Sequence, residues 1–103
     1  MIKIKDNTIE YTKGDTFDLI VDASSEFLEG DTLRLIIAES ETAGPNIDNT
    51  YALSSDGVFI LTFSEQDKKK LEIKPYVYKL ILGDINNRII TQVSGDFLVK
   101  WGA

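Results

Sequence analysis

The chain has 103 residues and 43% of them are hydrophobic, which is enough for one domain with a buried core and too many for a disordered chain. Its net charge of -6 disfavours a nucleic-acid groove or an anionic membrane surface as partner, because both attract basic side chains. The sequence lacks cysteine and histidine, which excludes disulfides, thiolate metal sites, Ser-His-Asp triads and HExxH zinc sites.

Apolar residues recur at every second position along most of the chain, which predicts β-strands. The first strand lies at residues 1–5, and Ile9 and Tyr11 either continue it or begin a short second strand. Turn residues separate the later strands at intervals of roughly 8–12 residues, which is typical of a sandwich. These strands are expected at 16–22, 31–40, 49–53, 57–63, 76–82 and 95–101. We therefore predict that residues 1–103 form a single domain, an immunoglobulin-like antiparallel β-sandwich of about seven strands.

One short helical turn is predicted at about residues 64–71. Ser64 is a good N-cap, and Asp67 three residues later completes a near capping box. Three lysines at 68–70 place positive charge in the last turn, where it offsets the helix dipole. Leu71 is expected to return to the core, and Pro75 prevents any continuation. The turn is expected to lead the chain from one sheet to the other.

Aromatic residues follow the strand period, so they are expected in the core, although a sugar-stacking platform is the alternative. Tyr76 and Tyr78 are expected to point inward, with at least one hydroxyl bonded to the backbone nearby. Trp101 and Tyr51 are the likelier aromatic side chains to be exposed. The residues expected in the core are Tyr11, Phe17, Phe59, Phe63, Tyr76, Tyr78 and Phe97.

The other polar groups that could form a site are expected to have structural roles. The lysine run suggests a polyanion site, but the acidic remainder of the chain favours a solvated helix end. Carboxylates gather in turns without matching a calcium loop, and the paired serines have no histidine or S-x-x-K lysine to activate them. We expect no catalytic residue, metal site or cofactor. The groups considered are Asp15 with Asp18, Glu29 with Asp31, Glu39 with Glu41, Ser24-Ser25 and Ser54-Ser55.

Four isoleucines sit at strand positions that point away from the main apolar set: Ile20, Ile36, Ile60 and Ile81. If their strands are neighbours, these residues form a contiguous apolar patch of the kind that marks an interface. The alternative is that a loop covers them or that they are scattered, as single exposed apolar residues are. The sequence does not decide between the two.

The order of these motifs resembles the N-terminal immunoglobulin-like domain of phage baseplate upper proteins, which occurs in tailed phages and prophages of Gram-positive bacteria. The resemblance covers residues 12–100, and its specificity lies in the order and spacing of short segments. The matching segments are GDTFDL at 14–19, GDTLRLII at 30–37, DGVFILT at 56–62, SEQD leading to Leu71, YVYKLIL at 76–82 and GDFLV at 95–99.

The resemblance implies a non-enzymatic structural or attachment domain that docks one phage tail or baseplate component onto another. Its partners would be other tail or baseplate proteins, with a homo-oligomer left open, and neither nucleic acid nor membrane. The protein would be made in the cytoplasm of the bacterial host and incorporated into the virion. The alternative function is a carbohydrate- or peptide-binding sandwich of a bacterial surface protein, and an enzyme ranks third.

Overall fold

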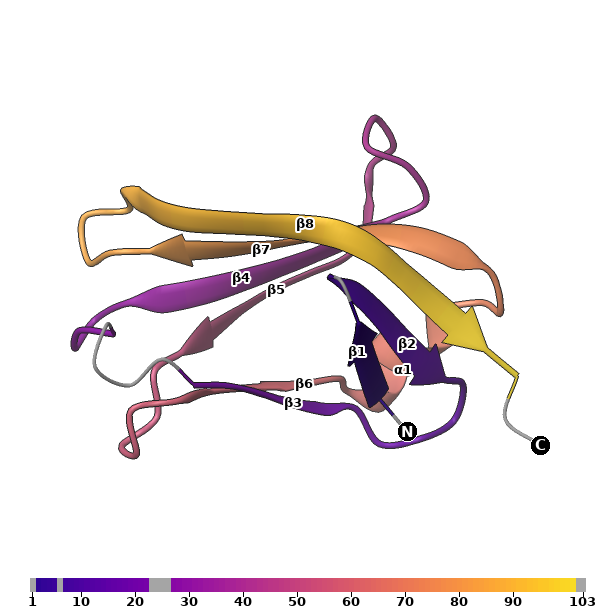
Figure 1. Cartoon of the computed structure of the whole chain (residues 1–103), viewed down its shortest axis with the longest axis horizontal. Coiled ribbons are helices and arrows are strands. Elements are labelled where there is room, and N and C mark those ends of the chain that lie inside the picture. The colour runs from indigo at the N-terminus through magenta and orange to yellow at the C-terminus, as the bar shows by residue number, and fades with distance from the viewer. Residues whose placement is uncertain (1, 6, 23–26, 102–103) are drawn as a thin grey trace.

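The protein is a sandwich of two β-sheets with one short helix (Figure 1). The computed structural model describes residues 2–5, 7–22 and 27–101. The larger sheet has six strands, in the order β1 (Ile2–Lys5), β2 (Thr8–Thr12), β8 (Ile89–Lys100), β7 (Pro75–Gly83), β4 (Thr32–Ala38) and β5 (Pro45–Ala52). The smaller sheet pairs β3 (Asp18–Val21) with β6 (Phe59–Thr62), and α1 (Glu65–Lys69) connects the sheets. The predicted all-β sandwich with one helical turn is confirmed.

Neighbouring strands are antiparallel in both sheets, except that β2 runs parallel to β8. Ile9 lies opposite Phe97, and Thr12 lies opposite Lys100. The hairpin of β1 and β2 is thereby attached to the last strand of the chain. Alternation of apolar residues assigns faces and not strand direction, so the sequence could not reveal this parallel pair.

The core lies between the two sheets and is built from inward-facing strand positions. In β4, for example, Leu33, Leu35 and Ile37 are buried while Arg34 is exposed. All seven aromatic residues expected in the core are buried, as predicted. Phe17 and Phe63 stack with ring centroids 4.0 Å apart, and Tyr11 meets both rings edge-on. Burial of such side chains is the main stabilising term for a domain of this size.

Local capping explains the position of α1. The Ser64 hydroxyl accepts a hydrogen bond from the Asp67 N–H at 3.1 Å, and the Asp67 carboxylate accepts one from the Ser64 N–H at 3.2 Å, which completes the capping box. At the other end the Lys13 ammonium donates to the carbonyls of Lys68, at 2.7 Å, and Leu71. Leu71 is fully buried, so it fixes this short helix to the core.

Two tyrosines of β7 tie neighbouring segments to the sandwich. The Tyr76 hydroxyl accepts a hydrogen bond from the Glu72 N–H at 2.8 Å, four residues upstream. The Tyr78 hydroxyl donates to the Asn7 carbonyl at 2.7 Å, at the end of the β1–β2 hairpin. The first contact resembles the tyrosine corner of immunoglobulin-like domains, and it confirms the predicted bond to the backbone.

Gly95 of β8 is required by a close approach of two backbones. A Cβ added at this position would lie 2.1 Å from the carbonyl oxygen of Asn7. Asn7 itself adopts a positive φ of 66°, which turns the chain between β1 and β2. The hairpin therefore sits directly against β8 only because residue 95 has no side chain.

Candidate functional site

The four isoleucines of the predicted patch lie on two different sheets. Ile20 and Ile60 face each other across the β3–β6 pair and are 63% and 46% exposed. Ile36 and Ile81 lie on β4 and β7, on the outer face of the six-stranded sheet, and are half-buried. These two faces are on opposite sides of the sandwich, so the four isoleucines do not form the contiguous patch that was one of the two alternatives.

Polar groups surround Ile36 and Ile81 on the outer face. Arg34 lies opposite Ile81, and its guanidinium makes two hydrogen bonds to the Asp48 carboxylate, at 2.7 and 2.5 Å. This pairing holds the pKa of Asp48 below its usual 3.8. The loop that contains Ser40 closes a small hollow of about 160 Å³ over Ile36. The surroundings of Ile36 therefore fit the alternative in which a loop covers the isoleucine better than they fit an open apolar patch.

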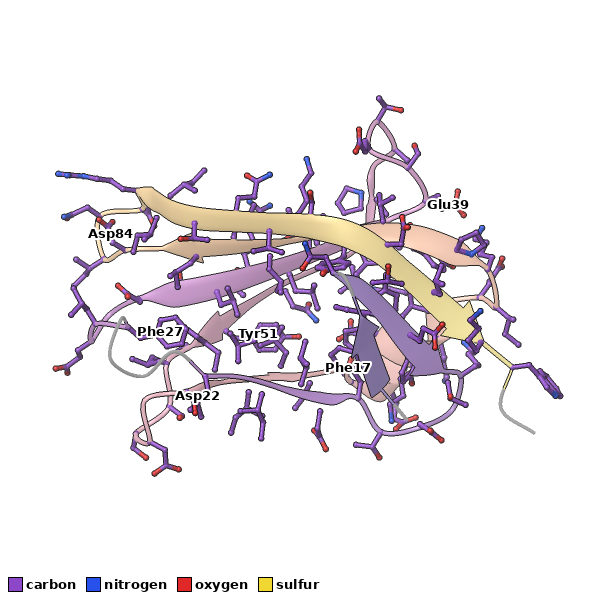
Figure 2. All side chains as sticks on the ribbon, in the orientation of Figure 1. Phe17, Asp22, Phe27, Glu39, Tyr51 and Asp84 are labelled. Atoms are coloured by element: carbon purple, nitrogen blue, oxygen red, sulfur yellow. The ribbon has the colours of Figure 1, made fainter. Side chains whose placement is uncertain are left out.

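The aromatic residues do not form an exposed platform in the described part of the chain. Trp101 is 74% exposed, as expected, but it stands alone at the end of β8. Phe27 and Tyr51 are half-buried and point between the sheets (Figure 2). The arrangement offers no flat stack of rings on which a sugar could lie.

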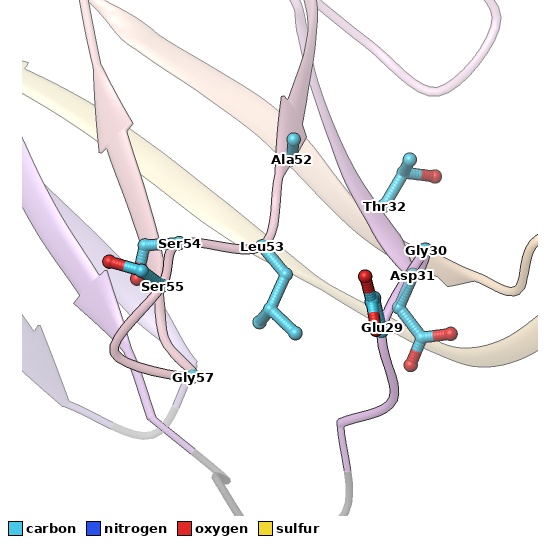
Figure 3. A pocket seen from close by; sticks show the side chains of 9 residues that line it. All are labelled: Glu29, Gly30, Asp31, Thr32, Ala52, Leu53, Ser54, Ser55 and Gly57. Atoms are coloured by element: carbon cyan, nitrogen blue, oxygen red, sulfur yellow. The ribbon is translucent and has the colours of Figure 1, made fainter.

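A pocket of about 450 Å³ at one end of the sandwich includes one of the predicted carboxylate pairs (Figure 3). Asp31 is buried, and its carboxylate accepts a hydrogen bond from the Leu28 N–H at 2.9 Å, which closes a turn. The hydroxyl of Ser54 closes the opposite turn by accepting from the Val58 N–H at 3.4 Å. Glu29 is exposed. Two of the polar side chains that line this pocket therefore hold turns.

The remaining predicted groups are dispersed. Lys68 pairs with Glu65 at 3.1 Å, while Lys69 and Lys70 lie exposed at the helix end. Glu39 pairs with Lys74. Asp15 and Asp18 are exposed beside the β2–β3 turn, and Ser24-Ser25 lie outside the described residues.

The two lateral edges of the sandwich differ. On the side of β5 and β6 the sheets are joined by side chains: the Tyr51 hydroxyl donates to the Thr62 carbonyl at 2.7 Å, and the Asn49 amide donates to the Asp67 carboxylate at 3.0 Å. The Asn49 amide also donates to the Tyr51 hydroxyl at 3.2 Å. These bonds close that edge from β5 to the start of α1.

The opposite edge, at β8, is open in the part of the chain that the structure describes. Here β2 pairs only with residues 97–100, while β7 pairs with β8 from Ile89 onward. Six consecutive residues from Ile89 to Ser94 are exposed, and they include three large apolar side chains. Ile89 is 65% exposed, Ile90 51% and Val93 36%. We call the side of β8 from Ile89 to Ser94 that faces away from β7 the open edge (Figure 1).

An apolar cavity of about 200 Å³ lies beneath the open edge, where the two-stranded sheet does not cover the six-stranded one. We call it the side groove. It is lined by Val21, Phe27, Leu33, Leu80, Leu82, Thr91 and Val93. Together, the open edge and the side groove offer unpaired backbone groups beside an apolar surface.

The described residues were also compared with the requirements of a metal site and of a membrane-spanning helix. They contain no group of three or more side chains arranged to bind a metal ion. None of their helices has the length and apolar character needed to cross a membrane. Comparison with protein-family models and with curated proteins finds no match to this chain.

Sequence reasoning missed the open edge. Residues 89–94 have no apolar alternation, because both faces of the strand are exposed there. A signal was nevertheless present: the segment IITQVSG has no charged residue, no proline and several β-branched side chains. Such a run in an acidic protein indicates a strand that is available for pairing.

Proposed function

We propose that this chain is a non-enzymatic structural or attachment domain of a phage tail or baseplate, or of a prophage-encoded equivalent, and that it acts through protein–protein contacts. The open edge with its side groove is the observation that carries the contact function. An unpaired strand beside an apolar groove accepts an extended segment by hydrogen bonding along the backbone, while alternate side chains enter the groove. The resemblance of its motif order to that of baseplate upper proteins supports the assignment to a virion.

The open edge equally suits the peptide-binding half of the alternative, a module of a bacterial surface protein. Carbohydrate binding has less support, because the aromatic residues that would stack on a sugar are in the core. A non-enzymatic role is supported by the placement of the acidic groups, since Asp31 closes a turn and Glu39 pairs with Lys74.

The genes that flank the coding sequence test the assignment to a phage. We expect tail and lysis genes on either side, and we expect the protein in purified virions, detected by mass spectrometry and located on the tail by antibody labelling. A polysaccharide-utilisation cluster as neighbour, together with absence from the particles, would refute it.

Ligand binding separates the two functions directly. The purified chain should show no affinity for a panel of bacterial cell-wall glycans in calorimetry. Saturable binding of one glycan that is lost on Trp101→Ala would favour the carbohydrate alternative instead. Ile36→Ala, a change on a different face, serves as the matched control.

A further inference from the structure

The smaller sheet leaves one side of the larger sheet without a strand beneath it. β6 lies under β5, since the Tyr51 hydroxyl of β5 donates to the Thr62 carbonyl of β6. β3 lies on the other side of β6, and its Val21 lines the side groove together with residues of β7 and β8. Within the described residues no strand pairs with the free edge of β3, the edge that faces away from β6 (Figure 1). A third strand at this edge would lie under β7 and β8, where the side groove is.

The inner face of the larger sheet becomes more exposed from β4 towards β8. Two rows of cross-strand neighbours run from β4 through β7 to β8: Leu33–Leu82–Thr91 and Leu35–Leu80–Val93. In each row the β4 residue is buried, the β7 residue is half-buried and the β8 residue is exposed. This face is therefore least covered where a strand beside β3 would cover it.

The side groove has room for the side chains of such a strand. An apolar cavity of about 150 Å³ is large enough to hold a benzene molecule, and the side groove measures about 200 Å³. Its lining side chains are apolar except for Thr91. The inward residues of an added strand would therefore be apolar, with space for at least one large side chain.

The outward side chains of β3 specify the other face of the added strand. Asp18 and Ile20 point away from the core and are exposed, and Asp22, which follows β3, is exposed as well. Residues of a neighbouring strand lie directly beside them, where opposite charges are favourable and like charges are unfavourable. The outward face of the partner would therefore read basic, apolar, basic. This pattern is symmetric about Ile20, so it suits a parallel and an antiparallel strand alike.

The geometry of the two strands that border the groove favours β3 over β8 for pairing. A segment in the groove can pair with only one of them, because paired strands lie about 4.8 Å apart and packed sheets about 10 Å apart. The register of β8 against β7 shifts between Thr91 and Ile89, and such bulges turn an edge away from pairing. Asn7 lies against Gly95, so residues 91–94 are the regular part of the open edge. The pairing of β3 with β6 has no shift.

The sequence of this chain does not supply the partner segment. Only Lys70 and Lys74 are basic residues four positions apart, and the residue midway between them is Glu72. A second copy would also bring a net charge of -6 to an acidic strand. The charge pattern of β3 thus points to a different protein.

We propose that the side groove binds an extended segment of another protein, which pairs with the free edge of β3 as a third strand of the smaller sheet. Alternate residues of this segment are apolar and enter the groove. The residues between them are basic, apolar and basic, and they lie beside Asp18, Ile20 and Asp22. The inference rests on the proposed function, because both treat the side groove as a protein contact, and it goes further by naming the strand that pairs and the chemistry of the partner.

Binding of synthetic peptides to the full 103-residue chain tests the proposal. The probe is a labelled peptide with the core Lys-Val-Ile-Val-Lys between Gly-Ser ends, and fluorescence anisotropy should show saturable binding with a Kd below about 1 mM. Glutamate in place of both lysines should weaken binding at least about tenfold, because like charges then lie side by side. Serine in place of both valines should abolish binding, since no apolar side chain enters the groove.

Variants of the chain test the two faces separately. Asp18→Lys should weaken binding of the lysine peptide at least about threefold and strengthen binding of the glutamate peptide. Glu41→Lys makes the same charge change on an exposed loop over the outer face of the larger sheet, and it should change neither. Val93→Asp places a charge in the groove and should abolish binding. Its circular dichroism spectrum should stay native, because Val93 is already 36% exposed.

Hydrogen exchange identifies the strand that pairs. Amides of residues 18–22 should exchange more slowly when the lysine peptide is bound, and those of residues 91–94 should not. The Val99 N–H donates to the Lys74 carbonyl on the β7 side, so by alternation along the strand the Gln92 N–H points to the open edge. Slower exchange at residues 91–94, with binding lost on Gln92→Pro, would place the segment on β8 and overturn pairing with β3 while supporting the proposed function.

The other outcomes also separate this inference from the proposed function. Equal binding of the lysine and glutamate peptides, or no saturable binding of either, would overturn the inference. If the chain is nevertheless found in virions, the attachment function stands. A chain that dimerises in sedimentation equilibrium, and loses the dimer on Val93→Asp, would make a second copy the occupant of the groove and refute the partner proposed here.

Discussion

Replacing Gly95 with alanine should release the β1–β2 hairpin from β8. The added Cβ would lie 2.1 Å from the Asn7 carbonyl oxygen, well inside the 3.0 Å below which such contacts essentially never occur. The obstacle is backbone, so no side chain can rotate away to relieve it. The hairpin must therefore move, and the hydrogen bond from the Tyr78 hydroxyl to the same carbonyl is then lost.

The expected cost has two parts. Forcing an extra carbon into a packed site costs about 1–3 kcal/mol, and losing the Tyr78 hydrogen bond costs about 1 kcal/mol. The sum is about 2–4 kcal/mol, and each kcal/mol lowers the melting temperature of a domain of this size by about 4–8 °C. We therefore expect Gly95→Ala to melt at least about 8 °C below the parent chain in circular dichroism.

Gly44→Ala is the matched control, because nothing lies within 4 Å of a Cβ added at residue 44. It reports the effect of glycine-to-alanine replacement on the unfolded chain, which is stabilising by about 0.4–1 kcal/mol. Hydrogen exchange should also show faster exchange in residues 8–12 of Gly95→Ala alone. If the two variants melt within about 2 °C of each other, the close approach of Asn7 to Gly95 does not hold the hairpin.

Three further predictions concern the connection through α1. Tyr76→Phe leaves the Glu72 N–H without its partner and should lower the free energy of unfolding in urea by about 1 kcal/mol. An unchanged denaturation midpoint would show that the bond from Glu72 to Tyr76 does not stabilise the fold. Leu71→Ala opens a cavity under the helix and should cost about 2–5 kcal/mol by the same assay, whereas a cost below that range would mean that Leu71 does not hold α1. The pKa of Asp67 lies below its usual 3.8 because hydrogen bonds from Asn49 and the N-cap outweigh its burial, which raises the pKa. This carboxylate therefore stabilises the fold fully above the unfolded pKa, and the stabilisation is lost as the pH falls through the lower folded pKa. Stability measured against pH should fall less steeply in acid for Asp67→Asn, and an identical slope would refute the assignment.

The parts of the fold that the sequence predicted are those encoded locally. Strand faces follow from alternation, and the helix follows from Ser64, Asp67 and the lysines around one turn. These signals lie within a few residues of the structure they determine. The inward tyrosines of β7 were predictable for the same reason, because the strand period places Tyr76 and Tyr78 on one face.

The parts that the sequence did not predict depend on pairing between distant segments. The four isoleucines were correctly placed on outward faces, but alternation does not tell to which sheet a strand belongs. Ile20 and Ile81 therefore ended on opposite sides of the molecule. The first half of β8 is a strand because β7 pairs with it along its length, and its own residues carry no alternation.

The parallel pairing of β2 with β8 determines how the domain responds to a pulling force applied at its two ends. Ile2 lies beside Tyr11, and Tyr11 lies beside Val99, so both ends of the described chain are at the same end of the sheet (Figure 1). Tension would first peel β1 from β2 one residue pair at a time. The load would then act along β2 and β8 in opposite directions, so that all hydrogen bonds between them resist together. A domain held in this way would tolerate tension through its backbone until that short parallel contact slides.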